Sequence, residues 1–245
     1  MSYRLIWADE FDYQGSPNPD KWKNDIGGHG FGNKEEQYYV SNLKNCYVAD
    51  GCLTIKAFKE DKENKKYTSA KLTTYNKMTC RYGRIAVKAQ LPSGKGTWPA
   101  IWMLGVDIKD KGRWPLCGEI DIMEHVGKKQ DYIVHSLHSA SYNHVLNNHR
   151  THEIYVSGVS ERFIEYAIDW YSDRIDFFVD GEKVTTFRKG ERSDDDKKAG
   201  WPFNKPFFLI LNLALGGTWG GPIDDAIFPV VMKVKYVRVY DIIGD

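Results

Sequence analysis

The sequence lacks several features that would place it in a specialised class. No apolar run reaches about 18 residues, so no transmembrane helix is expected. Its 34 basic side chains balance 33 acidic ones, and the net charge of +1 leaves no electrostatic footprint for nucleic acid. We expect no secretory leader in these residues, because those after Met1 lead directly into a strand-like segment. The chain is therefore either cytoplasmic or the trimmed form of an exported protein.

Cysteine is scarce, and the four cysteines match no metal-binding spacing. Cys46 and Cys52 flank Asp50-Gly51, which predicts a two-residue hairpin turn. That register pairs Ala49 with Cys52, so the two thiols do not lie opposite each other. We expect free, partly buried cysteines.

Turn residues and short strands fill most of the chain. Residues 164–170 and 231–240 alternate between apolar and polar side chains, and residues 174–179 and 183–187 form a second hairpin around Asp180-Gly181. The apolar run 207–213 is typical of a strand covered on both faces. The charged run 191–198 indicates a solvated loop. With no linker, repeat or long amphipathic helix, residues 1–245 predict one all-β domain, an antiparallel sandwich or jelly roll.

Three carboxylates occur close together in Gly118-Glu119-Ile120-Asp121-Ile122-Met123-Glu124. A strand sends alternate residues to one face, so Glu119 and Asp121 share a face while the isoleucines enter the core. Strict alternation would also bury Glu124, at a high free-energy cost. One extra residue, a β-bulge near Met123, would return Glu124 to the polar face.

Such crowding has chemical consequences. Like charges at short range cannot all ionise cheaply, so at least one carboxyl group holds a proton. We expect a raised pKa for Glu124, with Asp121 hydrogen-bonded to Glu119. An exposed acidic strand face is the ordinary alternative, but the isoleucines and Met123 mark a buried strand, where carboxylates gather for function. Retaining glycoside hydrolysis needs two carboxyl groups about 5–5.5 Å apart.

The run Glu-Ile-Asp-Ile-Met-Glu resembles the signature of glycoside hydrolase family 16, in its bulged laminarinase-like form. The resemblance covers nearly the whole chain. It includes the following segments in the family's order: Trp7 to Asp12, Gly32 to Tyr39, Tyr82 to Ile85, Trp98 to Leu104, Leu211 to Gly217 and Tyr236 to Tyr240.

This resemblance implies a concanavalin-like jelly roll of two antiparallel sheets with a concave glycan cleft. It implies endo-cleavage of β-glucans or galactans with retention. Glu119 would be the nucleophile, Asp121 the assisting residue and Glu124 the acid/base. His138 matches a family histidine that reaches the active centre, and Asn33 matches a residue that binds sugar hydroxyls on the non-reducing side of the cut.

Tryptophans near these motifs are candidate sugar contacts. Trp98 and Trp102 share a strand face with small and apolar residues, which fits a core stripe equally well, but the family places them at the cleft floor. Trp114, five residues before Glu119, is expected to stack on a sugar at the cleft edge. Trp219, between glycines, is expected on a flexible loop in contact with ligand.

Five of the seven histidines lie between His135 and His152, but their spacing fits no zinc pattern. Apart from His138 we interpret them as surface or structural residues. Lys88 stands where the family often has arginine; it keeps the charge, and we count it among the substrate-binding residues. Lys71 and Phe31 also replace an arginine and a tryptophan that are common there. Lys235 replaces an acidic calcium ligand, so the structural calcium of many members is expected to be missing or altered.

The sequence thus predicts an endo-acting retaining β-glucanase that cleaves β-1,3-glucan or mixed-linkage β-1,3/1,4-glucan without a cofactor. Its partner would be the polysaccharide alone, and we expect a monomer that is secreted, cell-surface or periplasmic. Four alternatives stay open: a transglycosylase, a galactan-active hydrolase, a non-catalytic glycan-binding sandwich, and a metal-dependent hydrolase that uses the histidines.

Overall fold

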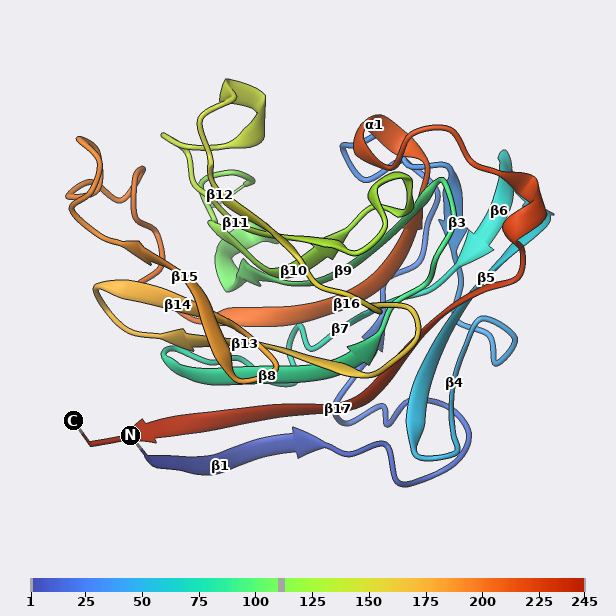
Figure 1. Cartoon of the computed structure of the whole chain (residues 1–245), viewed down its shortest axis with the longest axis horizontal. Coiled ribbons are helices and arrows are strands. Elements are labelled where there is room, and N and C mark those ends of the chain that lie inside the picture. The colour runs from blue at the N-terminus through green and yellow to red at the C-terminus, as the bar shows by residue number, and fades with distance from the viewer. Residues whose placement is uncertain (1, 110–112, 245) are drawn as a thin grey trace.

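Two stacked antiparallel sheets make up the molecule (Figure 1). The computed structural model describes residues 2–109 and 113–244. The larger sheet has ten strands in the order β15-β14-β13-β8-β17-β5-β6-β3, with β1 added beside β17 and β4 beside β5. Its strands are β1 Ser2–Asp9, β3 Gln37–Tyr39, β4 Cys46–Ala49, β5 Cys52–Lys62, β6 Lys65–Ser69, β8 Gly83–Gln90, β13 Ile164–Trp170, β14 Arg174–Val179, β15 Glu182–Arg188 and β17 Val230–Ile243. Within it, β3 and β6 pair in parallel.

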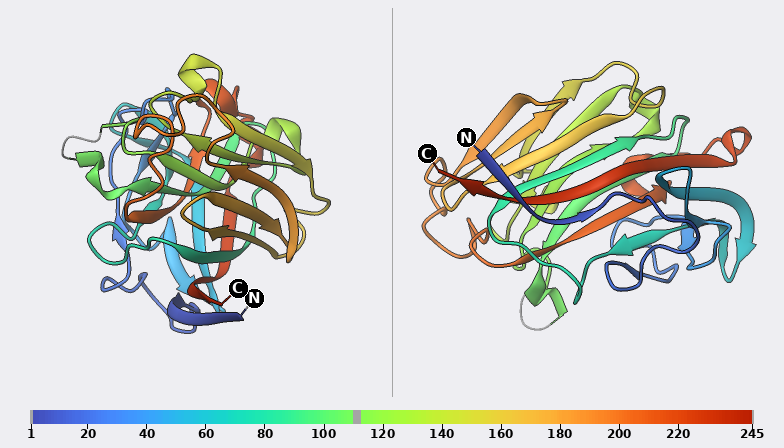
Figure 2. Two further views of the ribbon diagram at one scale, coloured as in Figure 1. Left: turned by 90° about the vertical axis from the view of Figure 1, so that its left-hand side faces the viewer. Right: turned by 90° about the horizontal axis from the view of Figure 1, so that it is seen from below.

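The smaller sheet has seven strands in the order β12-β11-β10-β9-β16-β7-β2. They are β2 Lys23–Asn24, β7 Lys71–Thr73, β9 Thr97–Gly105, β10 Glu119–His125, β11 Tyr132–His138, β12 Arg150–Tyr155 and β16 Phe207–Leu215. This sheet lies above the larger one in Figure 1, and seen from below the long strands β17 and β8 run across the opposite face (Figure 2).

The hydrophobic core lies between the two sheets and follows the period-2 alternation of the strands. Ile120 and Ile122 of β10 are fully buried there, as the sequence predicts. Burial of each such side chain stabilises the fold by about 1.5–3 kcal/mol. Every residue of β16 is buried, which confirms the predicted strand covered on both faces. Its odd-numbered residues enter the core, and Phe208, Ile210, Asn212 and Ala214 line a cleft on the other side.

Both predicted hairpins are present. In the first, Ala49 pairs with Cys52 and Cys46 with Ile55, and all four cysteines are free and buried. In the second, β14 and β15 meet across Asp180-Gly181. Asp50 and Asp180 have φ values of 54° and 48°, and Gly51 and Gly181 follow at 67° and 84°. Two consecutive residues of positive φ define a type I′ turn, whose twist matches that of the flanking strands.

The charged run 191–198 forms a loop, but the prediction that it is wholly solvated is wrong for one residue. Asp195 is 1% exposed and pairs with the buried Arg150 of β12 at 2.5 Å. It also accepts hydrogen bonds from the backbone N–H groups of Gly190 and Arg192. The loop is therefore anchored to the edge of the seven-stranded sheet by a buried carboxylate.

Helical structure in the described residues is limited to the single turn α1 Gly217–Gly220 and four short 3-10 turns, η1 Val106–Lys109, η2 Gly127–Lys129, η3 His144–Leu146 and η4 Asp225–Ile227. None of these helices has the length and apolar content needed to cross a bilayer. The all-β prediction is confirmed.

Candidate active site

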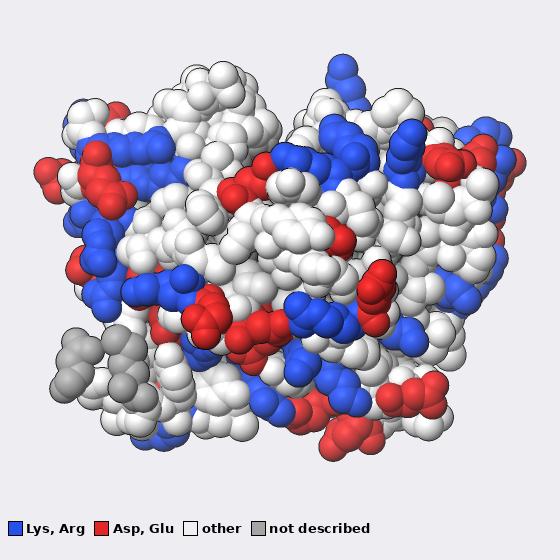
Figure 3. Space-filling model, in the orientation of Figure 1, with Lys and Arg blue, Asp and Glu red and all other residues white. Residues whose placement is uncertain are grey.

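A cleft of about 910 Å³ crosses the outer face of the seven-stranded sheet. Every strand of that sheet, from β2 to β12, contributes residues to it. In the space-filling view the upper outline is notched between two lobes (Figure 3). The strands of the sheet form the floor of this cleft, as is typical of ligand sites, which are concave and largely pre-formed.

Strand β10 carries the predicted β-bulge at the middle of the cleft. Against β11, Asp121 pairs with Ser136 and Glu124 with Val134, so two residues of β10 oppose one of β11. Against β9, the register shifts between Asp121 and Met123. Met123 is fully buried, and Glu124 lines the cleft with Glu119 and Asp121. The bulge thus brings all three carboxylates to one face.

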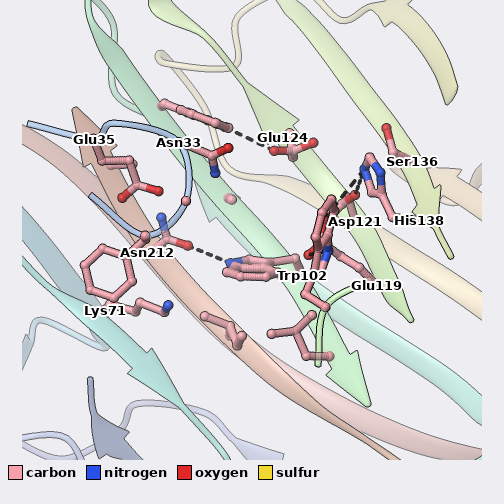
Figure 4. A pocket seen from close by; sticks show the side chains of 18 of the residues that line it. Asn33, Glu35, Lys71, Trp102, Glu119, Asp121, Glu124, Ser136, His138 and Asn212 are labelled. Carbon is pink, nitrogen blue, oxygen red and sulfur yellow. Dashed lines mark hydrogen bonds and ion pairs between the residues drawn. The ribbon is translucent and has the colours of Figure 1, made fainter. Parts of the chain in front are cut away.

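Asp121 and His138 lie side by side at the centre of this cluster (Figure 4). Nε2 of His138 is 3.2 Å from Oδ2 of Asp121 and 3.7 Å from Oε1 of Glu119. His138 comes from β11, where Glu119 is its cross-strand partner. Trp114 donates its indole N–H to Oε2 of Glu119 at 3.1 Å, so that carboxylate is held from two sides.

Burial raises the pKa of all three carboxyl groups. The pKa of Asp121 is raised well above its usual value by burial. The pKa of Glu119 is raised by burial and by Asp121, while His138 and the Trp114 N–H oppose that rise. Burial, with the charge of Asp121, raises the pKa of Glu124 to about 8. At neutral pH this cluster therefore holds protons, as the crowding argument predicts.

Glu124 is oriented by the two tryptophans on its side of the cleft. Trp98 donates its indole N–H to Oε1 of Glu124 at 3.1 Å. Trp219 packs edge-to-face on Trp98, with 5.4 Å between ring centroids. Trp219 lines the cleft but belongs to the helical turn α1, so the prediction of a loop is wrong. The ring of Trp219 therefore holds in place the indole of Trp98, which binds the candidate acid/base Glu124.

Aromatic rings form a wall beyond Glu119. The ring centroids of Trp114 and His144 are 5.0 Å apart, and the ring of His138 stacks on that of His149 with 4.9 Å between centroids. Both His144 and His149 line the cleft; His144 is exposed, which fits its prediction as a surface residue, but the place of the two rings beside the catalytic cluster was not predicted. The sequence gives no periodic signal for them, because the turn η3 and the chain after it fold back toward β11.

A polar network lies in the opposite half of the cleft, on β9, β16 and the segment before β3. Trp102 donates its indole N–H to Oδ1 of Asn212 at 2.6 Å, and Asn212 donates to the hydroxyl of Tyr39. That hydroxyl donates to Oε2 of the buried Glu35. A single asparagine in the apolar run 207–215 was the signal that could have identified Asn212 from sequence.

Asn33 lies on the loop that faces this network (Figure 4). Lys71 reaches the same region, 3.1 Å from Asp25 and with its ammonium group over the ring of Phe31. These side chains extend the site across the strands of the sheet, away from β10 and its carboxylates.

Lys88 does not belong to the cleft, and its prediction as a substrate-binding residue is wrong. It lies on β8 of the ten-stranded sheet, opposite Glu165 of β13 and Tyr236 of β17. On this strand Val87 and Ala89 face the core, so Lys88 points away from both core and cleft. The family motif fixes its place on the strand but not which sheet the strand joins.

One group in the described part of the chain has ligand atoms spaced as a metal site would require, namely Glu119, Asp121 and His138, within 4.8 Å of one another. These atoms already contact one another across the candidate catalytic cluster. The histidines between His135 and His152 do not add a second such group among the described residues.

Paired carboxyl groups on one bulged strand, set in an aromatic-walled cleft on a jelly roll, define a retaining glycoside hydrolase. The chain belongs to glycosyl hydrolase family 16, whose family model matches residues 33–237. This confirms the resemblance inferred from the catalytic run.

Known proteins of this family are similar over nearly the full chain. A beta-glucanase of Rhodothermus marinus is 46% identical, with 97% of this chain and 85% of that protein covered. The X-ray structure of the laminarinase from Rhodothermus marinus superposes with a TM-score of 0.94 at 45% identity, covering 99% of each chain. A mutant of SCLam, a non-specific endo-beta-1,3(4)-glucanase, shares the fold with a TM-score of 0.92 at 38% identity, covering 98% and 95%, and was crystallised with a glucan oligosaccharide at the active site.

Proposed function

We propose that this protein is an endo-acting, retaining β-glucanase that hydrolyses β-1,3-glucan or mixed-linkage β-1,3/1,4-glucan. The observation that carries the proposal is the bulge of β10, which places Glu119, Asp121 and Glu124 together in the cleft. The similarity to a beta-glucanase and to an endo-beta-1,3(4)-glucanase supports the same substrate class.

Glycosylation of the enzyme is the first step. Glu124, whose pKa of about 8 keeps it protonated at neutral pH, donates its proton to the glycosidic oxygen. Glu119 attacks the anomeric carbon and forms a covalent glycosyl-enzyme. Glu119 must be ionised to attack, and the Trp114 N–H stabilises its carboxylate form against the burial that raises its pKa.

Deglycosylation reverses the roles. Glu124, now a carboxylate beside the Trp98 N–H, takes a proton from water, and the resulting hydroxide attacks the same anomeric carbon. Glu119 leaves as a carboxylate, so the product keeps the β configuration after two inversions. Asp121 and His138 keep Glu119 oriented through both steps.

The charge of the cleft favours an uncharged glucan. Its lining includes three lysines, Lys23, Lys71 and Lys109, against six acidic residues. Because Asp121 and Glu124 are protonated at neutral pH, these charges nearly balance, and a sulfated galactan would find no excess of basic side chains to bind its sulfates. Flat tryptophan rings at Trp98 and Trp102, by contrast, cover the apolar faces of neutral sugars.

Removal of the nucleophile tests the catalytic assignment. Glu119→Ala should lower the release of reducing sugar from laminarin by at least about 10³-fold. Added azide should partly restore turnover of an activated aryl glycoside and yield the α-glycosyl azide. Unchanged hydrolysis by Glu119→Ala would contradict the assignment of Glu119 as the nucleophile, whereas binding of glucan without any hydrolysis by the native protein would support the non-catalytic sandwich.

A substrate panel tests the specificity. Laminarin, lichenan and barley β-glucan should be cut to oligosaccharides early in the reaction, while agarose and xyloglucan remain intact. Early release of single glucose units would contradict endo-cleavage, and activity on agarose alone would contradict the glucan assignment.

Further properties belong to the same proposal. We expect residues 1–245 to act as one catalytic domain, as a monomer, without a cofactor, and outside the cytoplasm where polysaccharide is available. Size-exclusion chromatography with light scattering measures the oligomeric state directly.

A further inference from the structure

One buried histidine occupies a special position relative to the catalytic bulge. Ile122 and Met123 of β10 fill the interval between the pairs Asp121–Ser136 and Glu124–Val134. His135 is the one residue of β11 in the same interval. Its neighbours Val134 and Ser136 line the cleft, so His135 points to the opposite side, into the core, where it is fully buried.

The imidazole of His135 contacts the backbone of the bulge. Its Nδ1 lies 2.7 Å from the carbonyl oxygen of Ile122. A carbonyl only accepts, so Nδ1 carries the hydrogen and donates it. Burial lowers the pKa of His135 to about 4, which keeps the ring neutral near pH 7. Nε2 then has no proton, and none of the residues that the structure describes forms a hydrogen bond with it.

At Ile122 the regular pairing of β10 is interrupted with both of its neighbours, β9 and β11. Ile122 has no registered partner on β9 or on β11, although Asp121 and Glu124 have partners on both strands. A carbonyl left there without a donor would be a buried, unsatisfied acceptor. The regular strand that would satisfy it would turn Glu124 into the core. The His135 N–H therefore favours the bulged backbone over the regular one.

We propose that His135 is a positioning residue for the acid/base group, holding the β10 bulge from the core side through its Nδ1–H bond to Ile122. The inference rests on the proposed function, because it matters for catalysis only if Glu124 is the acid/base. His135 itself touches no substrate. It acts through the backbone between Asp121 and Glu124.

The native enzyme gives a direct test. Nitrogen NMR of protein labelled in its imidazole rings should show His135 as the neutral Nδ1–H tautomer at neutral pH. An Nε2–H tautomer, or a ring that titrates near neutral pH, would overturn the proposal. This measurement needs no variant and does not depend on activity.

Variants separate positioning from simple destabilisation. His135→Leu keeps an apolar side chain of similar size but removes the donor, and should lower kcat by about 10- to 100-fold. KM should change by less than about twofold, because the sugar-binding residues stay in place. His135→Asn restores a nitrogen on Cγ, where Nδ1 was, and should recover kcat to within about threefold of the native enzyme.

Leu137→Ala is the matched control, since Leu137 lies two residues along β11, is also buried in the core, and pairs with Ile120, outside the interval between Asp121 and Glu124. It should lower the melting temperature while kcat at moderate temperature is kept. Native kcat in folded His135→Leu, or the same kcat loss in Leu137→Ala, would overturn the proposal. If His135→Leu does not fold, His135→Gln replaces it, because its side-chain nitrogen lies one bond further from the backbone than that of His135→Asn. His135→Gln should then lose kcat while His135→Asn keeps it. Equal kcat for these two variants would contradict the positioning role.

The two proposals fail in distinguishable ways. If the proposed function is wrong, either the native protein does not hydrolyse glucan or Glu119→Ala is as active as the native protein, whatever the NMR tautomer shows. If only the positioning role is wrong, Glu119→Ala is inactive while His135→Leu is fully active.

Discussion

At the scale of single residues, the proton on Glu124 controls the pH range of the enzyme. Its pKa is raised to about 8 by burial and by Asp121, and the group must be protonated to act as the acid. We expect kcat/KM to rise with pH on the acid side as Glu119 ionises, and to fall about tenfold per pH unit above pH 8 as Glu124 loses its proton. A stopped assay on laminarin across pH 5–10 measures this limb. An alkaline limb that begins below pH 6 would contradict the assignment of Glu124.

The indole of Trp98 sets the position of that limb. Its N–H donates to Glu124 and lowers the carboxyl pKa, so its removal should raise the pKa further. Trp98→Phe keeps a ring against Trp219 and should move the alkaline limb of kcat/KM to higher pH. Trp102→Phe, which loses a bond to Asn212 instead, should leave the limb where it is. A downward shift in Trp98→Phe would contradict this account.

Sequence reasoning succeeded at residues whose neighbours are close along the chain and failed where the fold joins distant segments. Glu119, Asp121 and Glu124 share one strand, so period-2 alternation and the cost of burying a charge were sufficient. His144 and His149 reach the cleft because a loop folds back onto β11. No local pattern encodes that return.

At the scale of elements, the bulge of β10 was predictable because a regular strand would bury an unpaired carboxylate. The placement of β8 was not, because its apolar alternation is satisfied equally in either sheet. That is why Lys88 was assigned to the wrong face. Likewise, Gly217 to Gly220 were expected as a loop, yet the packing of Trp219 on Trp98 stabilises a helical turn.

The loop 191–198 gives a stability prediction at this scale. Asp195→Ala leaves Arg150 as an uncompensated buried charge, and the free energy of unfolding should fall by about 3–5 kcal/mol. Urea unfolding followed by tryptophan fluorescence measures the change. Asp196→Ala, one residue on and exposed, should change it by less than about 0.5 kcal/mol. Equal effects of the two substitutions would contradict the anchoring role of Asp195.

At the scale of the whole molecule, the two-sheet class followed from many short strands and from turn residues at regular intervals. The order of strands within each sheet did not, since pairs such as β8 with β17 join residues about 150 apart in sequence. Contacts of that separation are selected by packing over the entire core and leave no local signature.

The outer surface carries the prediction on calcium. Lys235 is exposed beside Gly51 and stands where the family resemblance implies an acidic calcium ligand. Its positive charge opposes the binding of a cation there. A ligand that binds only the folded state raises its melting temperature. We therefore expect equal melting temperatures in calcium and in chelator. Lys235→Asp should restore a calcium-dependent rise. A large loss of stability of the native protein in chelator would contradict the prediction.

The four buried thiols can report how often each part of the fold opens locally. Burial raises the pKa of the Cys46, Cys80 and Cys117 thiols to about 12, so an alkylating reagent meets almost no thiolate in the closed fold. Modification must wait until a strand separates from its neighbours. The alkylation rate of Cys46 would then report the local opening of the β4–β5 hairpin. The alkylation rate of Cys80, whose backbone pairs with Phe207 at the start of β16, would report opening beside that strand. Mass spectrometry of alkylated peptides would thereby rank the local stability of the two sheets without any added label.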